Sequence, residues 1–97
     1  MRNVVYLSKN AEKGLKKAPP PVQMKAALWR QIVETQGLRE ARLRKGFHDE
    51  PLAGKRKGER SVRLNLKWRA IYHTRIASDG SETIELVDVT EVTPHKY

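Results

Sequence analysis

The spacing of hydrophobic residues changes along the chain, and each spacing predicts a different element. Residues 3–7 are mostly β-branched, aromatic or aliphatic, which predicts a short strand. Apolar residues then follow at intervals of four and three, which predicts a helix over residues 9–17 with Ser8 as its N-cap. Three prolines at 19–21 end this helix, because proline has no N–H to donate in a helix interior.

A second helix is predicted from about residue 20 to residue 35, since proline suits a first helical turn. Its apolar residues fall on one helical face: Val22, Ala26, Leu28, Trp29, Ile32 and Val33. We expect Trp29 to lie in the core, and Gly37 suits the C-terminal cap. Two helices joined by a proline turn should form a hairpin that lies on a flat apolar surface.

Beyond residue 60 the period becomes two, which is typical of strands. We predict strands over residues 61–64, 68–75 and 82–90, separated by short polar turns. The last of these carries apolar residues on both faces, which predicts a central place in the sheet. Residues 38–44 fit either a last helical turn or the start of a strand, and residues 46–52 are expected to form an ordered loop.

These elements predict an α+β fold: an N-terminal strand and a helical hairpin packed on a four-stranded, mainly antiparallel sheet. The sheet is mainly antiparallel because short turns join neighbouring strands. We expect one domain over residues 1–97, with a short tail from residue 91. A domain of this length has little room for a deep pocket. A functional site should therefore lie in a shallow groove or on the face of the sheet that the helices leave open.

The distribution of charge along the chain indicates a class of binding partner. The chain carries 20 basic and 11 acidic side chains, a net charge of +9. The charge is uneven: residues 39–69 carry eleven basic and four acidic side chains, whereas residues 70–97 carry two and five. A basic middle on a small domain is the pattern expected for binding nucleic acid.

Several classes of chemistry are excluded or disfavoured. The chain has no cysteine, which excludes disulfides and thiolate metal sites. His48, His73 and His95 are not spaced by three or four residues, so no metal or other cofactor is expected. The apolar run at residues 4–7 is too short for the core of a secretion signal, and no stretch approaches the roughly 20 apolar residues that span a bilayer. We expect a cytoplasmic protein that does not bind membranes.

Cleavage of RNA is a reaction that needs neither metal nor protein nucleophile. The ribose 2′-OH attacks the phosphate, and the protein supplies a base, an acid and cations. The residues that could supply these are Glu50, Arg60, Arg63, Arg69, His95 and Tyr97. Arginine in the middle of a short strand is unusual unless it faces solvent or a ligand. The turn of Lys55, Arg56 and Lys57, with Arg60 nearby, could contact phosphates.

At these residues the sequence resembles a known family. Residues 52–69 resemble the HigB pattern, in which Leu-x-Gly-x-Arg-x-Gly precedes a Ser-Ile-Arg strand and an Asn-x-x-Trp-Arg turn. Glu50-Pro51-Leu52, Arg69 and the ending His95-Lys96-Tyr97 look like the arrangement in YoeB. The order of strands and helices also matches the RelE superfamily. The resemblance covers essentially the whole chain and is most specific over residues 50–72.

The resemblance implies a toxin of a bacterial toxin–antitoxin pair that cuts mRNA, usually in the ribosomal A site. Glu50 would then be the general base, Arg69 would hold the scissile phosphate, and Arg63 would add charge stabilisation. His95 would be the general acid, and Tyr97 would orient the phosphate or stack on a base. The expected partners are a cognate antitoxin, mRNA and the 70S ribosome.

Two other functions remain open. A ParE-like toxin would have the same fold but would act by binding DNA gyrase, which is not a nuclease function. A non-catalytic RNA-binding domain would need exposed aromatic side chains for stacking, and this chain has few aromatic residues. An antitoxin could either lay an acidic segment over the basic face or pack on the helical hairpin and block entry to the ribosome.

Overall fold

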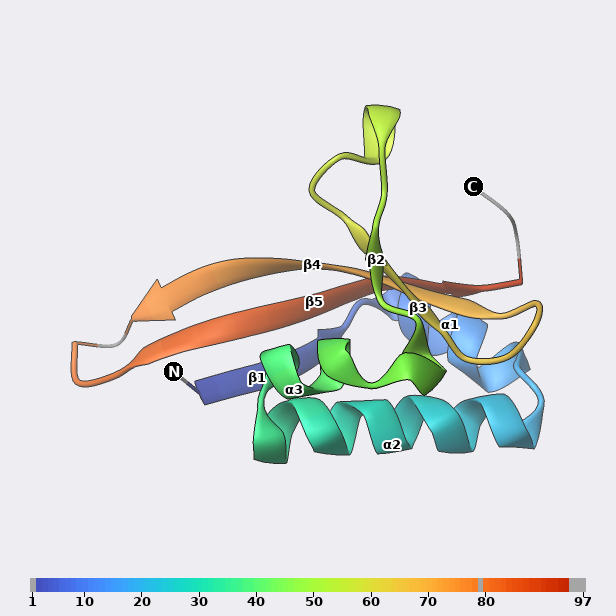
Figure 1. Cartoon of the computed structure of the whole chain (residues 1–97), viewed down its shortest axis with the longest axis horizontal. Coiled ribbons are helices and arrows are strands. Elements are labelled where there is room, and N and C mark those ends of the chain that lie inside the picture. The colour runs from blue at the N-terminus through green and yellow to red at the C-terminus, as the bar shows by residue number, and fades with distance from the viewer. Residues whose placement is uncertain (1, 79, 95–97) are drawn as a thin grey trace.

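The computed structural model describes residues 2–78 and 80–94. The elements in chain order are β1 (Arg2–Leu7), α1 (Lys9–Lys17), α2 (Pro20–Gln36), α3 (Leu38–Leu43), η1 (Lys45–Phe47), β2 (Glu50–Pro51), η2 (Gly54–Arg56), β3 (Arg60–Arg63), β4 (Arg69–Ser78) and β5 (Thr83–Thr93), where η marks a 3₁₀ turn. The strands form one sheet in the order β1-β5-β4-β3-β2 (Figure 1). β1 is parallel to β5, and the other neighbours are antiparallel.

The predicted α+β class is confirmed, with β5 inside the sheet between β1 and β4. The sheet has one strand more than expected, because the two residues of β2 pair with β3. The predicted caps are also found. The Ser8 hydroxyl accepts a hydrogen bond from the Ala11 amide at 3.0 Å, and Gly37 ends α2 with φ 99°. Residues 38–43 form a short third helix, which resolves the alternative left open by the sequence.

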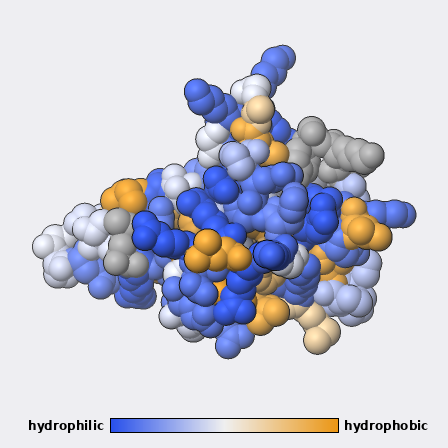
Figure 2. Space-filling model, in the orientation of Figure 1, coloured by the Kyte–Doolittle hydropathy of each residue, from blue (hydrophilic) through white to orange (hydrophobic). Residues whose placement is uncertain are grey.

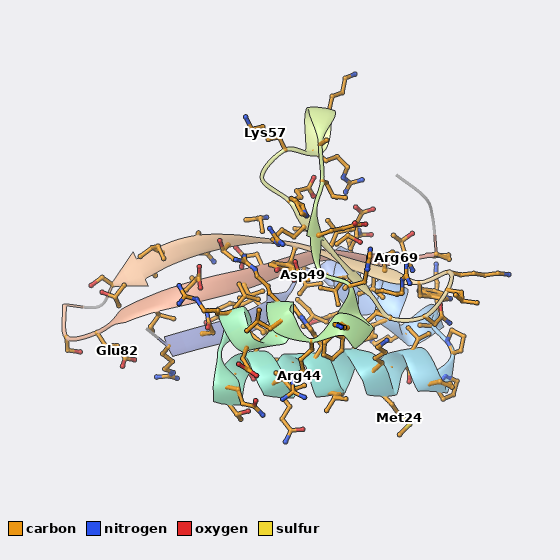
Figure 3. All side chains as sticks on the ribbon, in the orientation of Figure 1. Met24, Arg44, Asp49, Lys57, Arg69 and Glu82 are labelled. Carbon is orange, nitrogen blue, oxygen red and sulfur yellow. The ribbon has the colours of Figure 1, made fainter. Side chains whose placement is uncertain are left out.

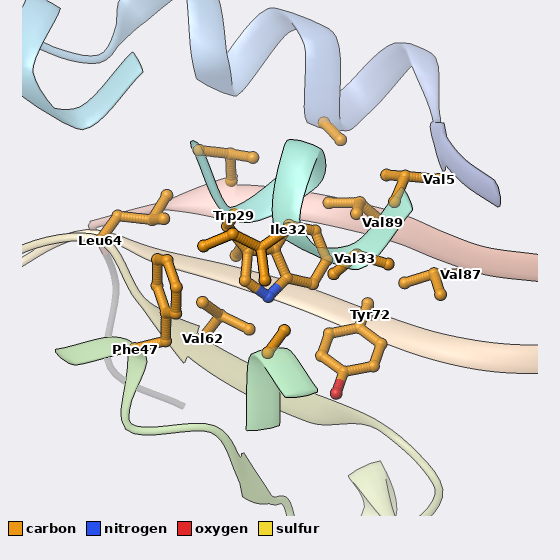
Figure 4. Packing of buried hydrophobic residues seen from close by; sticks show 14 of the residues in the cluster. Val5, Trp29, Ile32, Val33, Phe47, Val62, Leu64, Tyr72, Val87 and Val89 are labelled. Carbon is orange, nitrogen blue, oxygen red and sulfur yellow. The ribbon is translucent and has the colours of Figure 1, made fainter. Parts of the chain in front are cut away.

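The three helices pack their apolar residues on one side of the sheet, which we call the helix face. Trp29 is buried there, as expected, and its ring centroid lies 5.5 Å from that of Tyr72. The strands contribute alternate residues to this core: Val62, Ala70, Tyr72, Val87, Val89 and Val92 (Figure 4). Residues between these positions point to the opposite side, which we call the open face.

A bulge in β5 determines which residues reach the open face. Ile71 pairs with Glu91 and Tyr72 pairs with Val89, so Thr90 is an extra residue in β5. A bulge changes the face on which later residues of a strand lie. Val89 and Val92 therefore both enter the core, whereas Glu91 falls on the open face opposite Ile71. The prediction of a tail from residue 91 is wrong, because β5 continues to Thr93.

Residues 52–59 leave the sheet after β2 and return at β3, and we call this segment the arm. Its base is closed by the Leu52 amide, which donates to the Glu59 carbonyl at 2.9 Å. The arm projects away from the helices (Figure 1), and its Arg56 contacts Glu91 of β5. In the part of the chain that the structure describes, no helix has the length and apolar character needed to cross a membrane.

Candidate active site

Two arginines face one another on the open face. Arg63 of β3 and Arg69 of β4 are directly paired in the antiparallel register, and their neighbours Val62 and Ala70 lie in the core. The Arg69 guanidinium donates to the carbonyls of Asn65 and Trp68 at 2.6 and 3.1 Å. The Arg63 Nε is buried and has no hydrogen-bond partner among the described residues. Like charges opposite one another destabilise a sheet, so this pair suits a site that binds an anion.

Glu50 lies on the same face, two strands away from Arg69. It pairs with Ser61, which precedes Arg63 by two residues and shares its side of the sheet. The Glu50 side chain is about half exposed, and its Oε2 lies 3.3 Å from the Nε2 of His48. The open face thus holds a carboxylate and an arginine pair in solvent reach. A carboxylate could serve as the base and the arginines as the cations of a metal-free RNA-cleaving site, which also requires an acid.

The basic turn predicted at residues 55–57 lies in the arm, and its three cations differ in their surroundings. Arg56 donates to Glu59 at 3.1 Å and also forms an ion pair with Glu91 across the open face. Hydrogen bonds from these two carboxylates raise the pKa of Arg56. Lys55 and Lys57 are exposed, and hydrophilic side chains project from the arm (Figures 2 and 3). The two lysines are therefore the turn's freest cations.

Arg60 is not brought to the open face. It pairs with Tyr72 in the β3–β4 register, and its Nε donates to Asp49 Oδ1 at 2.5 Å. The Tyr72 hydroxyl donates to Asp49 Oδ2, also at 2.5 Å. Burial, together with this hydrogen bond to Asp49, holds the pKa of Tyr72 well above its ordinary value. Sequence reasoning missed Asp49, whereas the place of Arg60 could have been inferred, because it lies two residues before Val62.

The remaining predicted residues, His95 and Tyr97, lie outside the described residues. His73 is on the open face, where its Nε2 lies 3.3 Å from Asp88 of β5. Asp88 also accepts a hydrogen bond from Arg75 at 2.6 Å. Within residues 2–78 and 80–94, no three His, Cys, Asp or Glu side chains gather in a way that could hold a metal ion.

Comparisons with known proteins find a similar fold in solved structures of toxin–antitoxin proteins. No family model matches the sequence, and no curated protein matches it. Among solved structures, YafQ from E. coli is similar over 95% of this chain and 92% of its own, with a TM-score of 0.67 and 19% identity. The YoeB dimer from Staphylococcus aureus covers 100% of both chains, with a TM-score of 0.67 and 17% identity. One chain of the archaeal RelE–RelB complex from Pyrococcus horikoshii is similar over 97% of this chain and 96% of its own, with a TM-score of 0.64 and 21% identity. The chain therefore shares the fold of these solved structures.

Proposed function

We propose that this chain is the toxin of a toxin–antitoxin pair and that it cleaves mRNA, in the ribosomal A site, without a metal ion. The observation that carries the proposal is the Arg63–Arg69 pair on an open sheet face, with Glu50 on the same face. The shared fold with YafQ, YoeB and RelE toxins supports it. A cytoplasmic location follows from the proposed substrate.

The reaction begins when the ribose 2′-OH attacks the neighbouring phosphorus. Glu50 takes the proton of the 2′-OH as general base, which its exposure on the open face allows. The phosphorus passes through a pentacoordinate state with added negative charge. The bond to the 5′-oxygen then breaks, and the products are a 2′,3′-cyclic phosphate and a 5′-OH.

The arginine pair acts on the charge that develops during this step. Arg69 holds the scissile phosphate, and its guanidinium is already oriented by two backbone carbonyls. Arg63 adds a second cation from the neighbouring strand. Cations fixed before the reaction stabilise the transition state with little reorganisation. By the family resemblance, His95 protonates the leaving 5′-oxygen, and Tyr97 orients the phosphate or stacks on a base.

The arm binds RNA, and an antitoxin inhibits the toxin. Lys55 and Lys57, exposed in the arm, bind phosphates of mRNA or ribosomal RNA and so position the chain without reading sequence. A cognate antitoxin holds the toxin silent. We propose that it covers part of the basic open face, where an acidic segment would gain charge-assisted hydrogen bonds.

To test this function, the purified chain is added to ribosomes that carry a defined mRNA, and the cleavage products are mapped by primer extension. We expect cleavage within the A-site codon and a product that ends in a 2′,3′-cyclic phosphate. A matched mRNA with a single 2′-deoxynucleotide at the cleavage site should resist, because it lacks the nucleophile. If both the all-ribose and the 2′-deoxy mRNA stay intact and the chain inhibits gyrase supercoiling, the function is ParE-like instead.

A further inference from the structure

The carboxylate of Asp49 is buried next to the candidate base and joins separate elements. Its side chain has 0% exposure and accepts hydrogen bonds at 2.5 Å from Arg60 in β3 and from Tyr72 in β4. Arg42 of α3 donates to the same Tyr72 hydroxyl at 3.3 Å. A buried carboxylate is stable only when it is paired and hydrogen-bonded. We call Asp49, Arg60 and Tyr72 the clamp.

The backbone sends Asp49 and Glu50 in opposite directions. Glu50 stands on the open face opposite Ser61. Asp49, which precedes the strand, instead bonds Arg60 and Tyr72, whose side chains lie on the helix face. The residue before them, His48, adopts the left-handed conformation at φ 44° and ψ 51°, which is uncommon outside glycine. The clamp therefore anchors the residue that lies between this unusual turn and the candidate base.

Backbone pairing alone holds Glu50 weakly. The strand β2 has two residues, and the second is Pro51, which has no N–H to donate. On the far side, one hydrogen bond from Leu52 closes the base of the arm. By contrast, the clamp ties Asp49 to side chains of β3 and β4, the two strands that carry the arginine pair.

We propose that the clamp positions the Glu50 carboxylate relative to the arginine pair for the cleavage reaction proposed above, on which this inference rests. Its three residues are positioning residues, because their side chains lie on the helix face, away from the proposed RNA surface. A misplacement of about 1 Å at a distance from the reacting atoms can lower a rate by about 10²-fold. Loss of a clamp hydrogen bond should therefore lower the rate of the chemical step more than the affinity for RNA.

Tyr72→Phe tests the clamp with the least disturbance. The Tyr72 ring packs against Trp29 in the core, and its hydroxyl points away from the labelled core residues (Figure 4). The substitution keeps the ring and removes the hydrogen bond to Asp49. The matched control is Val33→Ala, which destabilises the same core from α2 but leaves the clamp intact. Asp49→Asn is a second clamp variant of nearly unchanged shape, used if Tyr72→Phe does not fold.

The experiment measures single-turnover cleavage of ribosome-bound mRNA, at a temperature where every variant is folded. We expect Tyr72→Phe or Asp49→Asn to cleave about tenfold or more slowly at saturating protein, with an unchanged half-saturating concentration. Val33→Ala should keep the wild-type rate. A clamp variant that cleaves as fast as Val33→Ala would overturn the proposal.

A second measurement separates this proposal from the function on which it rests. Hydrogen exchange of the Leu52 amide reports how firmly β2 and the arm are held, whether or not the chain cleaves RNA. Tyr72→Phe should accelerate exchange at Leu52 beyond its effect on global stability, whereas Val33→Ala should not. Equal exchange at Leu52 in the two variants contradicts the clamp. Absence of cleavage by the wild-type chain contradicts the proposed function instead.

Discussion

Arg63 and Arg69 stand directly opposite one another across β3 and β4, on the open face. Opposed like charges cost about 0.2–1 kcal/mol in a sheet, and the buried Arg63 Nε adds a cost because it has no hydrogen-bond partner among the described residues. In the proposed function both cations act on the same phosphate, which would offset this cost.

This relationship predicts opposite effects of one substitution on stability and activity. Arg63→Gln should leave the free energy of unfolding unchanged or raise it by up to about 1 kcal/mol, because the repulsion is removed. The same substitution should slow RNA cleavage by about tenfold or more. Urea unfolding at low salt and single-turnover cleavage measure the two effects. A large loss of stability would show that the pair is structural.

The arm predicts a specific change in salt dependence. Each phosphate contact on a single strand contributes about −0.7 to the slope of log affinity against log salt. Replacement of Lys55 and Lys57 by Gln should therefore flatten the slope for RNA binding by about 1.4. The matched control replaces Lys16 and Lys17 of α1, which are also exposed, and should leave the slope unchanged. Equal slopes in the two double variants would remove the arm from the binding surface.

Tyr72 predicts a loss of stability in alkaline solution. Its pKa in the folded chain is raised by burial and by the hydrogen bond to Asp49, whereas the unfolded chain should ionise near a pKa of about 10. The contribution of Tyr72 to the free energy of unfolding is fully present below its pKa in the unfolded chain. It is lost as the pH rises toward its pKa in the folded chain. Above about pH 10 it should fall by roughly 1.4 kcal/mol per pH unit. Urea unfolding from pH 8 to 11 should show this slope, and Tyr72→Phe should lack it; parallel curves would contradict the assignment.

Gly14 predicts a steric limit on the contact between α1 and β5. A Cβ at this position would lie 2.0 Å from the Val92 carbonyl oxygen, which is far inside van der Waals contact. Gly14→Ala should therefore destabilise the chain by about 1–3 kcal/mol despite the better helix propensity of alanine. Gly46→Ala is the control, because a Cβ there meets nothing within 4 Å. Thermal unfolding of both variants gives the comparison, and equal midpoints would contradict the close approach.

The elements β1, α1, α2, β3, β4 and β5 could be predicted because each has a local signal. The proline run marks the junction of α1 and α2, and the change of period marks the strands. The bulge at Thr90 and the two-residue β2 could not be predicted, since both depend on strand register. Register is set by packing between distant segments, which one sequence does not display.

The residues of the candidate site could be predicted in part, but their pairing and burial could not. Arg63 and Arg69 could be singled out because charged residues interrupt short strands, but their direct pairing required the register. Asp49 gave no signal, because a carboxylate in a loop is usually solvated, and only the fold buries it against Arg60 and Tyr72. Arg56 is expected to bind phosphate, and its ion pair with Glu91 depends on where the arm places Arg56 relative to β5.

In the proposed reaction the arginine pair on the open face stabilises the charge of the scissile phosphate. Single-turnover cleavage of ribosome-bound mRNA is compared for the wild-type chain, Arg69→Ala and Arg75→Ala. Arg75 lies on the same strand and face as Arg69 but at the far end, paired with Asp88. We predict that Arg69→Ala cleaves about 10²–10³-fold more slowly and that Arg75→Ala keeps the wild-type rate. A folded Arg69→Ala variant that cleaves at the wild-type rate would contradict the proposed role of the arginine pair.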